Sequence, residues 1–154
     1  MKSRSTESKT RYPTKDEILE LLEVEPDCNE YKTLKMATEQ WKKQMEIDKE
    51  NVWVFKSNTE KTRSLIKLCD IVSCKTGNYL NTYEGIDYSY SKWNFELCLG
   101  EKPSIISTLH ELVHFLGIES EVSAVHISLF IFKELYPKSF ESLRFEGETC
   151  IMKK

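Results

Sequence analysis

One short pattern, placed inside an amphipathic stretch, constrains this chain more than any other part of its sequence. Residues 110–114 read His-Glu-Leu-Val-His, or HExxH. Residues four positions apart lie about 40° apart around a helix and one turn along it, so both imidazoles project to the same side. We therefore expect a helix here, with Pro103 near its first turn and Gly117 as its stop.

The residues around the two histidines divide into an apolar side and a polar side. The apolar side repeats at helical spacing, and its members are Ile105, Ile106, Leu109, Leu112, Val113 and Leu116. Ser107, His110, Glu111 and His114 fall on the opposite side. An apolar stripe of this kind packs on a core, so the polar side is predicted to line a cleft.

The chemistry predicted for this polar side is zinc binding. Four-residue spacing lets two imidazole nitrogens approach one zinc ion at about 2.0–2.1 Å each. Glu111 is rotated one step from His110, too far to join it as a ligand, and is instead the candidate general base for a zinc-activated water. A surface helix that carries these residues by chance is the alternative, because the motif is short.

A catalytic zinc ion needs a third protein ligand and an open fourth position for water. Glu121 is the preferred third ligand, because Gly117 permits a left-handed turn and Ser120 can cap a following helix. Glu119 is an alternative that lies in the turn, where its direction is less constrained. His126 is the other alternative, about 140° around the helix from Glu121, but a hydrogen-bonded core position is preferred for it.

Length and charge bound the remaining possibilities. The 154 residues fit one domain, predicted to span 13–154 after a disordered leader at 1–12. The net charge of −3 provides no basic field for phosphate backbones, so nucleic acid is an unfavoured partner. No apolar run approaches the roughly 18 residues of a membrane span, which argues against a membrane partner. Nothing in the sequence indicates an oligomeric state.

The cysteines and the polar N-terminus predict a cytoplasmic protein. Five cysteines occur, an odd number, and no two have CxxC spacing, so a zinc ribbon or a disulfide framework is disfavoured. Scattered reduced thiols are typical of the cytosol. Met1 to Thr10 also lacks the apolar core of a secretory signal.

Helices are expected on both sides of a short strand-rich stretch. An acidic helix is predicted to open at Pro13 and Thr14, and a second to cover about Glu30 to Asp48. A third is predicted to follow a cap at Ser57 or Asn58. The last helix, Glu121 to about Leu135, is apolar on almost every side and is predicted to be buried. The strand candidates are Val52 to Phe55 and Asn94 to Leu99, which makes the expected class α+β.

The segment from Thr108 to His114 resembles the active-site helix of the zincin metallopeptidases. Its continuation through Gly117 to Glu121 and Ala124 is similar to the compact gluzincin variant, in which a Glu-x-x-Ala step on the next helix supplies a glutamate ligand. Small metallopeptidases related to the ImmA/IrrE group look alike in this respect. The resemblance covers residues 105–135, and its specific part is the HExxH motif.

This resemblance implies both a fold and an activity. The fold is a small twisted sheet packed on the HExxH helix, with an edge strand along the cleft, additional N-terminal helices and a buried C-terminal helix. The activity is zinc-dependent hydrolysis of peptide bonds, with a peptide or protein as substrate and one zinc ion per chain. His110, His114 and Glu121 would bind the metal, and Glu111 would serve as general base.

The residue that would stabilise the oxyanion is left open among four tyrosines: Tyr83, Tyr88, Tyr90 and Tyr136. Two other classes of function also remain open. One is a zincin-like binding or regulatory protein that keeps the metal without turnover. The other is a helical interaction protein in which the HExxH pattern is incidental. Metal content separates the helical interaction protein from the enzyme and from the silent zincin. A peptide-cleavage assay then separates the silent zincin from the enzyme.

Overall fold

Helices make up most of the structure. The computed structural model describes residues 12–45, 60–77, 89–92, 95–98, 104–146 and 149–152, with side chains for 12–45, 64–77 and 104–143. Its helices are α2 (Lys15–Leu21), α3 (Asn29–Gln44), α4 (Glu60–Thr76), α5 (Ile105–Phe115), α6 (Glu121–Leu135) and α7 (Pro137–Glu141). The strands in the described part are β1 (Ser89–Lys92), β2 (Phe95–Cys98), β3 (Leu143–Glu146) and β4 (Thr149–Met152).

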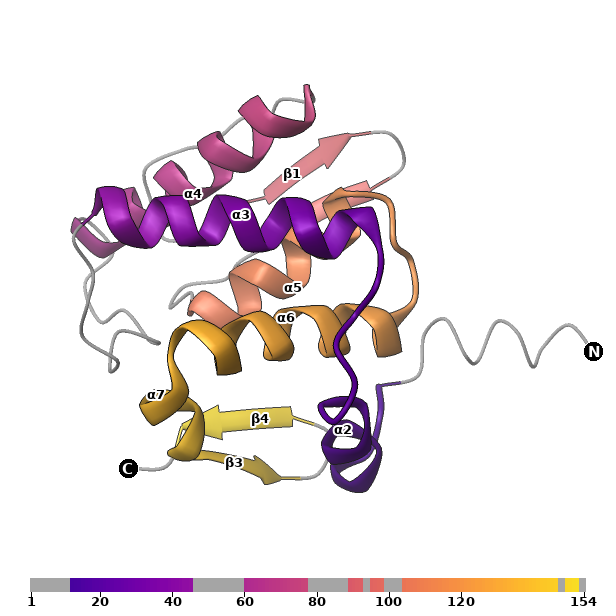
Figure 1. Cartoon of the computed structure of the whole chain (residues 1–154). Helices are drawn as coiled ribbons and strands as arrows, with labels where there is room; N and C mark the ends of the chain where they lie inside the picture. The colour runs from indigo at the N-terminus through magenta and orange to yellow at the C-terminus, as the bar shows by residue number, and fades with distance from the viewer. Residues whose placement is uncertain are drawn as a thin grey trace, which may run out of the picture.

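Helix α5 carries the HExxH motif and lies within the main hydrophobic core. It packs against α3, α4 and α6, which gather around it in Figure 1. Its residues Leu109, Leu112 and Val113 are fully buried in the main hydrophobic cluster. The predicted apolar side of this helix therefore does face the core, which fixes the rotation of α5 and turns its polar side away from the core.

Helix α2 is attached to the rest of the molecule through a second, smaller hydrophobic cluster. Ile18 and Leu22 of the α2 segment pack with Val125 and Leu129 of α6. Each pair is separated by four residues, so one stripe of each helix meets the other. The contact places α2 along the first turns of α6, as Figure 1 shows.

Side-chain caps explain where two of these helices begin. Thr14 accepts a hydrogen bond from the Glu17 amide, and the Glu17 carboxylate accepts one from the Thr14 amide, which forms a capping box before α2. Ser104 and Ser107 make the corresponding pair of contacts at the start of α5. These caps satisfy backbone amides that have no partner within the helix.

One buried tryptophan links α3 to α4. Trp41 is fully buried, and its indole Nε1 donates to the Ser64 carbonyl oxygen at 2.7 Å. A buried indole N–H needs such an acceptor, so this contact both fills the core and sets the position of α4 beside α3.

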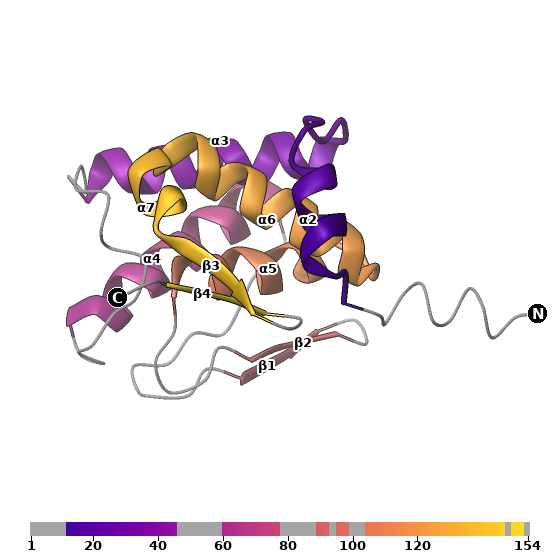
Figure 2. The same cartoon turned by 90° about the horizontal axis from the view of Figure 1, so that it is seen from below.

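The expected α+β class, with a small twisted sheet packed on the HExxH helix, is wrong. Helices form 76% of the part described in side-chain detail, and the described strands make only two separate antiparallel hairpins, β1–β2 and β3–β4 (Figure 2). Helices α3, α4 and α6 pack on α5, as does the strand β2, which belongs to a two-stranded hairpin. Burial of α5 is thus achieved by helix packing, with β2 as an additional contact.

Several smaller expectations can be compared with the structure. Helices α2, α3, α4, α5 and α6 occur close to where they were predicted, α6 is largely buried, and β2 lies inside the predicted strand at 94–99. The strand predicted at 52–55 and residues 1–11 of the predicted leader lie outside the described residues. Within the described residues, no helix is both long and apolar enough to cross a membrane.

We expect core truncation in α3 to be costly and surface truncation in the same helix to be mild. Leu34 is 0% exposed, whereas Met36 is 54% exposed. Leu34→Ala should lower the free energy of unfolding by about 2–5 kcal/mol, because it leaves a cavity in the main core. Met36→Ala should change it by less than about 0.5 kcal/mol. Urea denaturation of both variants measures the difference, and equal losses would contradict the assigned core.

Candidate metal centre

The two histidines of the motif lie on adjacent turns of α5, as the four-residue spacing predicts. The His110 and His114 rings are 4.9 Å apart between centroids, with their planes at 74°. Because the opposite side of α5 is anchored in the core, both rings are held on the side that faces the start of α6. Their placement is therefore a consequence of how α5 is buried.

A tight turn brings α6 back against α5. Gly117 has a φ of 110°, a conformation that residues with a side chain rarely adopt. The chain then reaches Ser120, whose hydroxyl accepts a hydrogen bond from the Ser123 amide and caps α6. Glu121 is the first residue of that helix, and fully buried Ala124 one turn on allows α5 and α6 to approach closely.

This arrangement places the Glu121 carboxylate between the two imidazoles. His110 Nε2 lies 3.0 Å from Glu121 Oε1, and His114 Nε2 lies 3.3 Å from Glu121 Oε2. One potential ligand atom from each of the three residues falls within 4.8 Å of the others. The three residues that the sequence selected as metal ligands are thus brought together in space. Their binding of a metal stays a prediction.

The tautomer of His114 makes this arrangement suitable for a cation. His114 Nδ1 lies 2.7 Å from the Ile118 carbonyl oxygen, which can only accept, so Nδ1 carries the ring proton. In the neutral ring Nε2 then presents a lone pair toward Glu121 Oε2, and two such atoms at 3.3 Å repel unless a proton or a metal ion lies between them. A backbone carbonyl that orients a ligand histidine in this way is common in metal sites.

Two of the donor-atom distances are also compatible with zinc. Two atoms that each lie 2.0–2.1 Å from a tetrahedral zinc ion are roughly 3.3–3.4 Å apart. The two histidine-to-glutamate distances of 3.0 and 3.3 Å are close to this value. Two histidines and a glutamate are moreover a ligand set that catalytic zinc sites use, with water in the fourth position. The chemistry of the three residues therefore fits the ion that their sequence pattern suggests.

Burial changes the acid–base properties of two residues at this site. It lowers the pKa of His110 below its ordinary value, and the nearby His114 lowers it further, while Glu121 opposes the change. A lowered pKa favours the neutral imidazole, which is the form that binds a metal. Burial raises the pKa of Glu111, with His114 opposing and Glu121 adding to the rise, and a more basic carboxylate is better suited to accept a proton.

The side chains of the candidate ligands are partly exposed, although the His114 Nε2 atom itself is buried. The exposed fractions of the side chains are 16% for His110, 11% for His114 and 30% for Glu121. A structural zinc site is normally closed by four protein ligands, whereas a catalytic site keeps one position open. Three partly exposed ligands agree with the second kind of site.

The structure separates the alternative ligands from this cluster. His126 lies on another side of α6, where its Nε2 donates to the Val24 carbonyl oxygen at 2.6 Å. It is half-buried and hydrogen-bonded between α6 and the segment after α2. Glu119 is an exposed residue of the turn and is not part of the three-residue group.

Of the four tyrosines proposed for the oxyanion, only Tyr136 has a described side chain, and it lies away from the site. Tyr136 follows the far end of α6, roughly 22 Å from Glu121 along the helix, and is 1% exposed beneath Lys42. Tyr83 and Tyr88 lie outside the described residues, and the Tyr90 side chain is likewise not described. Tyr136 is therefore excluded from a role at the metal centre.

A tyrosine that sequence reasoning missed does lie at the site. The Tyr12 ring stacks on the His110 imidazole, with centroids 6.3 Å apart and planes at 18°. Tyr12 falls at the end of the predicted leader, in no periodic pattern, so only the docking of α2 on α6 reveals it. Tyr12 precedes α2, so the His110 ring is restrained by a residue from outside α5.

The Ile118 carbonyl is a second feature that was not predicted. It lies four residues after His114, just beyond Gly117, which was recognised only as a helix stop. A carbonyl that follows a helix end has no intrahelical partner, and this general rule could have identified it.

Comparison with known proteins finds no matching family model, no matching curated protein and no matching solved structure.

Alanine substitutions of the three candidate third ligands are expected to have different effects on zinc binding. Glu121→Ala should weaken binding by more than about 100-fold, because a direct ligand contributes more than the outer-shell residues whose loss costs 10–100-fold. His126→Ala and Glu119→Ala should retain about one zinc ion per chain, because both lie away from the cluster. Zinc titration calorimetry with metal analysis measures all three.

The His126 variant is also expected to be less stable, since it loses the contact with Val24. Release of zinc by His126→Ala, together with its retention by Glu121→Ala, would replace the proposed site by one with three histidines.

Proposed function

We propose that this protein is a zinc-dependent metallopeptidase in which His110, His114 and Glu121 hold the metal and Glu111 is the general base. The observation that carries the proposal is the position of the Glu121 carboxylate, 3.0 and 3.3 Å from the two histidine Nε2 atoms. HExxH supplies two ligands by local spacing alone. The third comes from a different helix, which a chance HExxH pattern would not provide.

The chemistry that bound zinc supplies is Lewis acidity, which acidifies water and polarises a carbonyl group. His114 is kept in the tautomer that presents Nε2 by its Nδ1 contact to the Ile118 carbonyl. Tyr12 restrains the His110 ring by stacking. These two contacts pre-position the ligands, so that binding the metal requires little rearrangement of the side chains.

Glu111 is the residue assigned to proton transfer. It follows His110 in α5, is half-buried and has a raised pKa. A carboxylate in this position accepts a proton from the attacking water and delivers it to the departing amine. Because Glu111 does not belong to the three-residue cluster, it is free of the ligand role that would consume its lone pairs.

The proposed compartment is the cytoplasm. Cys28, Cys69 and Cys74 are free cysteines, and they range from buried to exposed. Thiols that stay reduced at such different depths suit a reducing compartment. The proposed substrates are peptides or proteins, the substrate class that the HExxH pattern suggests, and the partly exposed side chains of the three candidate ligands are compatible with a substrate reaching them.

Replacing the general base should separate metal binding from catalysis. Glu111→Gln should keep zinc and lose about 10²–10⁴-fold in kcat on any peptide that the wild type cleaves, the contribution of a positioned base. Zinc content and peptide hydrolysis are measured on the same preparation. Ser107→Ala, on the same side of α5, is the control for a general disturbance of the helix and should affect kcat far less.

Two results would contradict this assignment. Loss of zinc in Glu111→Gln would make Glu111 a ligand. A wild-type protein that binds zinc but cleaves no peptide in a broad library would instead favour the silent zincin-like alternative, and absence of zinc would favour the helical interaction protein.

A further inference from the structure

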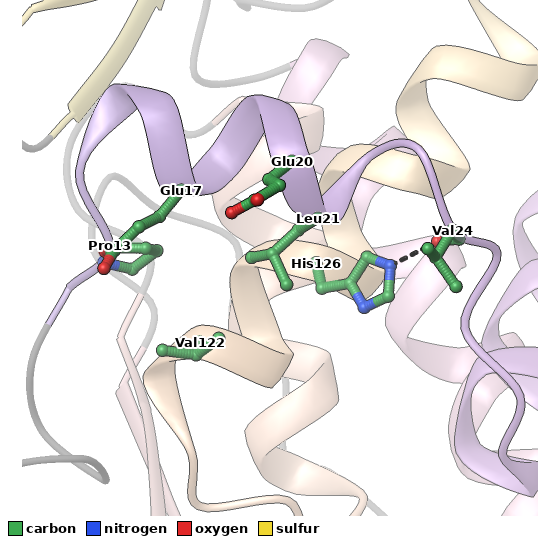
Figure 3. Close-up of a pocket in the computed structure, with 7 residues that line it drawn as sticks. All are labelled: Pro13, Glu17, Glu20, Leu21, Val24, Val122 and His126. Atoms are coloured by element: carbon green, nitrogen blue, oxygen red, sulfur yellow. Dashed lines mark hydrogen bonds between the residues drawn. The ribbon is translucent and has the colours of Figure 1, made fainter.

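A pocket lies beside the metal centre, between α2 and α6 (Figure 3). Its volume is about 390 Å³, within the range of sites that hold small ligands. The wall from α2 and its flanks is one helical stripe, made of Pro13, Glu17, Glu20, Leu21 and Val24. The facing wall is Val122 and His126, one turn apart on α6.

The pocket and the metal centre are neighbours along the chain at two points. Pro13 directly follows Tyr12, which stacks on His110, and Val122 directly follows the candidate ligand Glu121. Successive Cα atoms are 3.8 Å apart, and an extended peptide spans about 3.3–3.6 Å per residue. A peptide with its cleaved bond at the metal therefore reaches this pocket with a side chain within about two residues of that bond.

The chemistry of the walls selects the occupant. Leu21, Val24 and Val122 offer apolar surface, and the carboxylates of Glu17 and Glu20 stand at the α2 edge in Figure 3. A lysine or arginine side chain matches both features, because it buries an aliphatic stem while its charged end stays near solvent. An acidic side chain would be repelled by these two carboxylates, and a purely apolar one would gain nothing from their negative charge, which Glu17 keeps while it accepts a hydrogen bond from the Thr14 amide.

We propose that this pocket binds a lysine or arginine side chain of the substrate peptide, next to the bond that is cleaved. The inference rests on the proposed peptidase function of the neighbouring metal centre. Glu17 and Glu20 are three residues apart on α2, so they lie on the same side of the helix and can both face one guanidinium or ammonium group. Their role is to determine specificity.

His126 shapes the pocket without taking part in charge recognition. Its Nε2–H donates a hydrogen bond to the Val24 carbonyl oxygen at 2.6 Å. Figure 3 shows the ring lying between α6 and the segment that carries Val24. This hydrogen bond fixes the distance between the two walls at one end. The edge contact of the same ring with Phe130 supports its orientation.

The test uses the zinc-loaded full chain and a set of peptides that differ at a single position near the cleaved bond. That position carries arginine, lysine, citrulline, leucine or glutamate. We expect arginine and lysine peptides to have the highest kcat/KM. Glu17→Gln combined with Glu20→Gln should lower it about 10-fold for these two peptides only, as two partly exposed ion pairs allow. Glutamine at position 17 can still complete the capping box.

Glu23→Gln is the matched control, because it removes the same charge from an exposed residue outside the pocket. It should leave the preference for basic peptides intact. Glu20→Lys should shift the preference toward the glutamate peptide. High salt should also weaken the arginine-over-citrulline preference, because the contact is screened.

A second arm measures binding without cleavage. N-acetyl-arginine amide is titrated into the full chain, and NMR shifts of the Leu21, Val24 and Val122 methyl groups report on the pocket. Shifts that disappear in the double glutamine variant support the proposal even if no peptide is cleaved, in which case the peptidase function alone fails.

Cleavage that shows no preference for basic residues, or a preference that survives the double variant, overturns the proposed pocket and leaves the peptidase function standing. Absence of both cleavage and shifts overturns both proposals. Equal shifts with N-acetyl-leucine amide would show an apolar site and would likewise overturn the assignment to a basic side chain.

Discussion

The packing of α5 against α6 is the contact on which the candidate site depends. The turn at Gly117 reverses the chain, and buried Ala124 lets the two helices approach closely enough for Glu121 to reach the histidines of the preceding helix. The same buried surface holds the apolar side of α5 in the core. Stability and site geometry therefore have a common physical origin, and a change that separates α5 from α6 would affect both.

The local parts of this arrangement could be predicted from the sequence. The HExxH spacing, the stop at Gly117 and the cap at Ser120 all act within a few residues, so they follow from helix geometry and backbone conformation. The choice of Glu121 over His126 could also be argued locally, because five residues rotate His126 to another side of α6. These features need no knowledge of the distant chain.

The features that could not be predicted depend on contacts between distant segments. The strand at β2 exists, yet the cover of α5 is provided mainly by α3, α4 and α6, and an apolar stripe does not reveal which kind of element will pack on it. Tyr12 was missed for the same reason, since it reaches His110 only because α2 docks on α6. The pocket between these helices has that origin as well.

The central claim is that one zinc ion occupies the space between His110, His114 and Glu121. A crystal structure of the zinc-loaded protein, with anomalous data at the zinc edge, tests it most directly. The account predicts one peak per chain, bonded to both histidine Nε2 atoms and to the Glu121 carboxylate at about 2.0–2.2 Å. A peak at other residues, or a Glu121 carboxylate that still contacts both histidines with no metal between them, would contradict it.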